Sequence, residues 1–92
     1  RAIRRKLGTY QVDEVMAFVL RTFCDGVKVA CEITLMATDA GLIPAGREVI
    51  AIGGTGQGAD SALVLRSANS QDCLDLRVLE VICKPRCGGR PA

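Results

Sequence analysis

The chain has 92 residues, of which 49% are hydrophobic and 24% charged, so it is long enough for one domain and apolar enough to form a core. Its net charge of +2 is far from the basic excess of dedicated nucleic-acid-binding domains, so nucleic acid is not expected as a partner. No apolar stretch approaches the ~20 uninterrupted residues of a transmembrane helix, so no membrane partner is expected either.

Four of the twelve cationic residues lie at the start of the chain, as Arg1, Arg4, Arg5 and Lys6. No aromatic residues alternate with these cations to stack on bases. The cluster therefore indicates a solvated segment rather than a phosphate-binding arm.

Two helices are predicted in the first half of the chain. Over residues 12–23, apolar side chains recur at steps of three and four, which places them on one helical face. A second helix is predicted to begin at an N-cap Asp25 and to end at Ala40-Gly41, where glycine can adopt the left-handed cap conformation. Because this second segment is apolar nearly all round, we expect it to be largely buried.

Three strands are predicted in the second half. Residues 48–52 are apolar on both faces, which is typical of a strand that is covered on both sides in an α/β fold. Residues 62–65 predict a second strand, and the alternation over residues 76–83 predicts a more exposed edge strand. Helices on one side would leave the other face of so small a sheet uncovered, which favours either a homo-oligomer or a further N-terminal part of the domain. Residues 87–92 are predicted to be a flexible tail.

The most distinctive segment, residues 53–60, joins the first two predicted strands and holds four of the ten glycines. Successive glycines at the end of a buried strand let backbone amides converge on an anion, and ligands of open α/β sheets bind at that end of the strands. We therefore predict a ligand-binding loop. Its residues are Gly53, Gly54, Thr55, Gly56, Gln57, Gly58, Ala59, Asp60 and Ser61. The alternative is a tight connection between two strands that binds nothing.

The nature of the anion is less defined. Residues 54–59 fit the dinucleotide pattern G-x-G-x-x-G/A, but a predicted strand follows where a long helix is required. A Walker A loop is excluded, because Ala59 and Asp60 stand where Lys and Ser/Thr must be. The loop contains no cation, so a phosphate would depend on backbone amides and on the hydroxyls of Thr55 and Ser61. Asp60 is expected first to bond the loop amides and only second to contact a ligand.

The chain contains no histidine, which excludes Ser-His and Cys-His nucleophiles and histidine metal sites, so neither a catalytic residue nor a metal site is predicted. Five cysteines are present, and Cys24, Cys31 and Cys83 lie within apolar periodic segments. This pattern is typical of buried, reduced thiols in a cytoplasmic protein. Cys83 and Cys87 form a C-x3-C pair, but two cysteines alone do not complete a zinc site.

Four motifs carry a resemblance to a known family: Gly26-Val27-Lys28-Val29-Ala30-Cys31-Glu32, Asp39-Ala40-Gly41-Leu42-Ile43-Pro44, residues 52–59, and Ile82-Cys83-Lys84-Pro85-Arg86. Over nearly its whole length the chain resembles the uncharacterised archaeal and bacterial "pyruvate kinase alpha/beta domain" proteins. The resemblance implies the fold of the pyruvate kinase C-terminal domain, a three-layer α/β/α sandwich with a mixed sheet. It implies no kinase activity, because the family lacks the catalytic barrel. It also implies that the chain is the C-terminal part of a longer domain.

The same resemblance implies a phosphorylated ligand, with flavin mononucleotide (FMN) as the candidate cofactor, at Gly53, Gly54, Thr55, Gly56, Gly58, Ala59 and Asp60. The sequence departs from the family at Gln57, where an arginine is common, and at Ser67-Ala68-Asn69, where Pro-Ala-His is common. The expected function is therefore an uncharacterised, non-catalytic ligand-binding α/β domain. The alternatives are a flavin-dependent or phosphate-handling enzyme and a structural or oligomerisation module.

Overall fold

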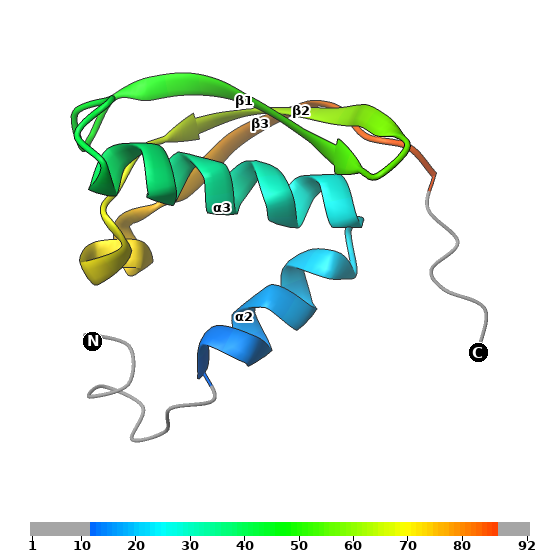
Figure 1. Ribbon diagram of the computed structural model, residues 1–92, viewed down its shortest axis with the longest axis horizontal. Coiled ribbons are helices and arrows are strands. Elements are labelled where there is room, and N and C mark those ends of the chain that lie inside the picture. The colour runs from blue at the N-terminus through cyan, green and yellow to red at the C-terminus, as the bar shows by residue number, and fades with distance from the viewer. Residues whose placement is uncertain (1–11, 87–92) are drawn as a thin grey trace.

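The computed structural model describes residues 12–86 and has two helices followed by a three-stranded sheet (Figure 1). The elements are α2 (Val12–Arg21), α3 (Asp25–Asp39), β1 (Glu48–Thr55), β2 (Gly58–Arg66), the 3-10 helix η1 (Ser70–Asp75) and β3 (Arg77–Cys83). This is a small α/β fold, as predicted. The basic residues at the start of the chain and the predicted tail over 87–92 lie outside the described residues.

The strands lie in the order β1-β2-β3, and both pairings are antiparallel. A mixed sheet is therefore not present within residues 12–86. The long helix α3 runs across one face of the sheet, and α2 packs against α3 on the side away from the strands (Figure 1). The described part of the chain thus has a sheet layer and helices on one side of it.

Helix α3 has clearly defined ends. Its N-cap position is Cys24, so the prediction of Asp25 as the N-cap is wrong by one residue. At the other end Gly41 has a φ of 77°, which an L side chain rarely adopts. The N–H groups of Gly41 and Leu42 donate to carbonyls of the last turn at 3.0 and 2.9 Å. This Schellman arrangement confirms the glycine-terminated end that the sequence predicts.

Helix α3 is buried on one face only. The buried residues are Gly26, Val27, Ala30, Cys31, Thr34 and Thr38. On the other side Ile33 and Met36 are 44% and 63% exposed, so the expectation of a largely buried helix holds for the face toward the sheet and not for these two apolar residues. The hydroxyls of the two buried threonines donate to carbonyls one turn back, at 2.9 and 2.8 Å, which lets these polar groups lie in the core.

The core lies between α3 and the sheet. Leu63 and Leu65 of β2 are fully buried, and they pack with Ala51 of β1 and with the buried face of α3. On the opposite face of the sheet Ile50 and Ile52 are 65% and 59% exposed. The predicted cover on both sides of β1 is therefore absent within residues 12–86, whereas the predicted uncovered face of the sheet is confirmed.

Helix α2 confirms the helix predicted over residues 12–23, although it ends at Arg21, two residues early, and its apolar side is only partly packed. Met16 and Leu20 are partly buried and lie toward the core. Val15, Phe18 and Val19 are half exposed or more, and so is Phe23, which follows the helix. Much of the apolar side of α2 therefore faces solvent in the described part of the chain.

Candidate functional site

The glycine-rich segment is a β-hairpin rather than an open loop. β1 continues through Gly53 and Gly54 to Thr55, and β2 begins at Gly58, which leaves only Gly56-Gln57 as the turn. The predicted bounds of a loop over residues 53–60 are therefore wrong, because most of these glycines lie in paired strands. The two-residue turn is a tight connection between two strands, as the alternative of a segment that binds nothing predicts. This geometry does not bear on whether a ligand binds.

Gly53 has a structural reason to be glycine. A Cβ at this position would lie 2.8 Å from the backbone nitrogen of Ala30 and would overlap the carbonyl oxygen of Gly26. The first turns of α3 therefore pack directly against the backbone of β1, with no side chain between them. Such close approach is possible only for glycine.

The other glycines of the hairpin differ from one another. A Cβ at Gly54 would lie 2.7 Å from the Cα of Ala59, and Gly58 has a φ of 125°. Both positions therefore favour glycine for reasons of fold. Gly56 has no positive φ, and no atom lies within 4 Å of a Cβ built there. Among the four glycines of the hairpin, Gly56 alone is unexplained by packing or backbone conformation.

Asp60 is an extra residue in β2. Gly53 pairs with Ser61 and Gly54 with Ala59, so Asp60 bulges out of the register between them. The buried hydroxyl of Ser61 donates to the Asp60 carboxylate at 2.8 Å and lies 3.3 Å from the Cys24 thiol. The carboxylate lies over Gly26 in the first turn of α3, where the helix dipole stabilises negative charge. An acidic group of the chain itself therefore lies beside the first turn of α3.

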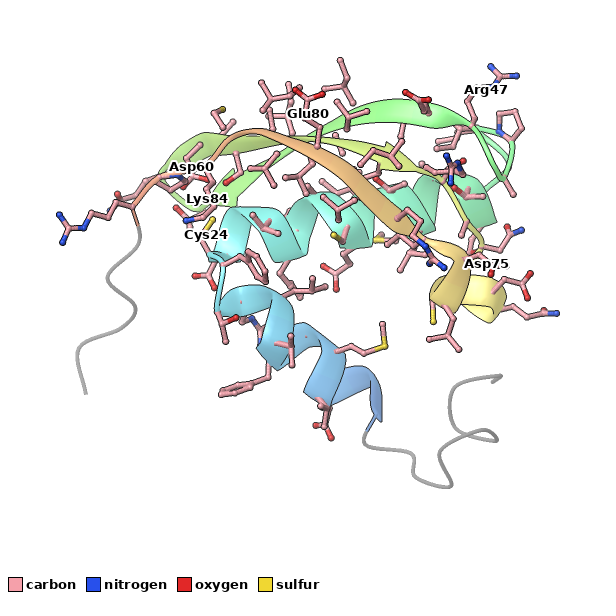
Figure 2. All side chains as sticks on the ribbon, turned by 180° about the vertical axis from the view of Figure 1, so that it is seen from behind. Cys24, Arg47, Asp60, Asp75, Glu80 and Lys84 are labelled. Carbon is pink, nitrogen blue, oxygen red and sulfur yellow. The ribbon has the colours of Figure 1, made fainter. Side chains whose placement is uncertain are left out.

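A cation lies beside this hairpin that local sequence patterns did not reveal. Ala62 pairs with Cys83, so the chain leaving β3 passes the base of the hairpin. Figure 2 shows Lys84, Asp60 and Cys24 gathered at this end of the sheet. Lys84 is exposed, and its ammonium group donates to the carbonyl of Pro85 at 3.0 Å. Only the register of β2 with β3 brings this lysine to the predicted site.

The predicted site residues thus form one contiguous end of the sheet. Gly53 and Ser61 are buried at its base, Gly54 is partly buried, and residues 55–60 are exposed. At the tip the Gln57 N–H donates to the Thr55 hydroxyl at 3.3 Å. The chemical groups on offer are a hydroxyl, turn amides, a carboxylate and the nearby ammonium of Lys84.

The segment Ser67-Ala68-Asn69 lies elsewhere. It follows the end of β2 opposite to the hairpin, so the fold does not bring it to the predicted site. The buried Ser67 hydroxyl donates to the Pro44 carbonyl at 2.6 Å and accepts from the Arg47 N–H at 3.0 Å. This serine joins the loop before β1 to the end of β2, and its observed role is structural.

The cysteines match the predictions in part. Cys24 and Cys31 are buried as predicted, but Cys83 is exposed because it lies on the outer strand β3, so that prediction is wrong. Burial raises the pKa of the Cys31 thiol to about 11, which disfavours its reactive thiolate form. Cys73, which the sequence pattern did not single out, is also buried, and Cys87 lies outside the described residues.

A hollow of about 280 Å³ lies between α2, α3 and η1. Its walls are largely apolar, with contributions from Met16, Leu20, Leu35 and Leu76. The Lys28–Glu32 ion pair, with 2.9 Å between nitrogen and oxygen, also contributes to the lining. Nothing in the sequence predicted this hollow, because it depends on how α2 and η1 meet α3.

No protein-family model matches the chain. Over residues 12–86, no three or more His, Cys, Asp or Glu side chains are grouped so that they could hold a metal ion. In the same part of the chain, neither helix has the length and apolar character needed to cross a membrane.

Proposed function

We propose that the chain is a ligand-binding α/β domain that holds a phosphorylated small molecule at the hairpin end of its sheet, without catalysis by its own side chains. The observation that carries the proposal is the exposed turn at Gly56, a glycine without a packing role, in a hairpin whose base lies beside the exposed cation Lys84. A small residue in an open turn leaves its backbone amides accessible to an anion.

The ligand phosphate is proposed to lie on the Lys84 side of the hairpin rather than at the N-terminus of α3. The Asp60 carboxylate already lies over the first turn of that helix, and it would repel a second anion there. The Lys84 ammonium, the Thr55 hydroxyl and the turn amides are then the groups that hold the phosphate. Charge-assisted hydrogen bonds of this kind are stronger than neutral ones.

FMN is the specific ligand that the family resemblance favours, and a sugar phosphate is the alternative. The three-layer sandwich with a mixed sheet belongs to the same proposal, and the exposed isoleucines on the outer face of the sheet support it. A cytoplasmic location is also part of this proposal.

Isothermal titration with FMN and with a sugar bisphosphate tests the proposal. Lys84→Gln should weaken binding about tenfold, because it removes one charge-assisted contact. Arg47→Gln is the matched control, since Arg47 is a cation at the opposite end of the sheet (Figure 2). Gly56→Val should weaken binding by steric exclusion while circular dichroism shows an intact fold, because a Cβ built at that position has no neighbouring atom within 4 Å.

A gain of affinity is also expected. Gln57→Arg adds a cation at the tip of the hairpin and should tighten binding by about 1 kcal/mol at low salt, with a smaller gain at high salt. Equal affinity of the wild type, Lys84→Gln and Gly56→Val for either ligand, or no binding of either, would show that the hairpin is only a turn.

A further inference from the structure

Helix α2 has an exposed apolar stripe, here called the α2 stripe, formed by Val15, Phe18 and Val19. These residues are 57%, 68% and 50% exposed, although all three are large and hydrophobic. Their spacing of three and four residues places them on one side of the helix. Phe18 is the largest and most exposed member of the stripe and lies near the middle of the ten-residue helix. Aromatic residues in such central positions are the side chains that dominate protein interfaces.

Two residues of opposite charge flank the stripe, one near each end of α2. Glu14 and Arg21 are seven residues apart, so they lie about two turns apart on the same flank of α2. Both are exposed, with the negative charge at the start of the helix and the positive charge at its end. Arg21 is also 4.0 Å from Asp25, a separation at which the ion pair is weak.

We propose that the α2 stripe is a docking surface for a second copy of this chain, with the two α2 helices antiparallel about a two-fold axis near Phe18. In that arrangement each stripe covers the other, as an interface that pairs identical patches requires. Glu14 of one copy lies opposite the partner's Arg21, and the symmetry forms this pair twice. A parallel two-fold arrangement would place Glu14 and the partner's Arg21 on opposite flanks and at opposite ends of the interface, so only the antiparallel one forms these ion pairs.

The size of the surface sets the strength of the association. A ten-residue helix is about 15 Å long, so two crossed copies form a small interface of the weak and transient class. We therefore expect a monomer–dimer equilibrium with a dissociation constant in the micromolar range rather than a permanent dimer. This inference does not depend on the proposed ligand site, which lies on the sheet.

Sedimentation velocity of the full chain, over low to high micromolar concentrations, measures the equilibrium. Phe18→Lys should weaken dimerisation at least about 30-fold, because it removes a central aromatic anchor and places two lysines near the axis. Leu42→Lys is the matched control, since Leu42 is 78% exposed but lies after α3, and this variant should dimerise like the wild type.

A charge exchange tests the orientation of the helices. Glu14→Arg and Arg21→Glu should each weaken the dimer about threefold, and the double variant should regain most of the loss, because the opposite pairs form again. Circular dichroism of each variant checks that α2 still forms. Several results would overturn the proposal: a wild-type chain that stays monomeric, charge variants whose losses simply add, or a dimer that survives Phe18→Lys. Loss of the dimer in Ile52→Lys with Phe18→Lys unaffected would assign the contact to the outer face of the sheet instead.

Discussion

Folding changes the pKa of the Cys31 thiol. It is 2% exposed, and desolvation raises its pKa from 9.0 to about 11. Between these pH values the folded chain keeps the proton while the unfolded chain loses it. The contribution to stability is therefore complete below pH 9 and is lost as the pH rises toward 11.

Removing this thiol should flatten the pH dependence of stability. Between pH 9 and 11 we expect the free energy of unfolding to fall by about 2 kcal/mol more in the wild type than in Cys31→Ala. Denaturant unfolding of both proteins at either end of this range measures the difference, and the variant controls for the other groups that titrate there. Parallel losses in the two proteins would contradict the expected role of burial.

At the same scale, the sequence predicted some side-chain environments better than others. Cys24 and Cys31 were predicted to be buried from the periodicity of a helix, and a helix turns only one face toward its core. Cys83 was predicted to be buried for a similar reason but is exposed. It belongs to β3, which was correctly predicted to be an exposed edge strand, but the alternation within the strand did not reveal that its apolar side also lacks cover.

At the scale of elements, the helices were predicted well and the hairpin was not. The turn chemistry of Gly41 is a local signal, so the end of α3 followed from a few neighbouring residues. The glycines at positions 53 and 54 also form a local pattern, but that pattern predicted an open loop where the structure has a paired strand. Their role depends on the close approach of α3 and of the opposing strand, which are contacts between segments distant in sequence or across the turn. Lys84 was missed for the same reason.

Helix α2 should be the first described helix to open. Its packing is confined to α3 and, through Met16, to Cys73 of η1, and the side chains that make these contacts are only partly buried. We expect its amide hydrogens to exchange through local opening, much faster than those in the middle of α3, which is buried against the sheet. Hydrogen exchange at low protein concentration, where the chain is monomeric, measures both helices at once. Equal protection of α2 and α3 would show that α2 is also stabilised by contacts outside residues 12–86.

At the scale of the whole molecule, the core lies on one side of the sheet. Leu63 is fully buried between the sheet and α3, whereas Ile50 is 65% exposed on the outer face. Leu63→Ala should therefore lower the free energy of unfolding by about 2–5 kcal/mol. Ile50→Ala is the matched truncation on the uncovered face, and we expect it to cost less than about 1 kcal/mol. Denaturant titration compares them, and similar costs would mean that the outer face is covered in solution.

The one-sided core also explains why the sequence predicted cover on both faces of β1. The strand is apolar on both sides, and an apolar pattern indicates which side chains gain from leaving water. It does not indicate what covers them. Within residues 12–86 one helix covers one face, and Ile50 and Ile52 remain on the other. The pattern correctly predicted that both faces of β1 are apolar, but within residues 12–86 no second layer covers the outer face.

The contact between α3 and the base of the hairpin also limits how related sequences can vary. Gly26 lies beneath Asp60 and Ser61, and Gly53 lies against the backbone of Gly26 and Ala30. A Cβ at Gly53 would meet backbone atoms of α3, so no smaller neighbouring side chain could make room for it, whereas a Cβ at Gly26 would meet the side chains of Asp60 and Ser61. Gly56, by contrast, has open space around it. Among functional relatives we therefore expect Gly26 and Gly53 to be retained together, while position 56 changes freely unless a ligand constrains it. The pattern of variation at three glycines would then separate the demands of folding from those of binding.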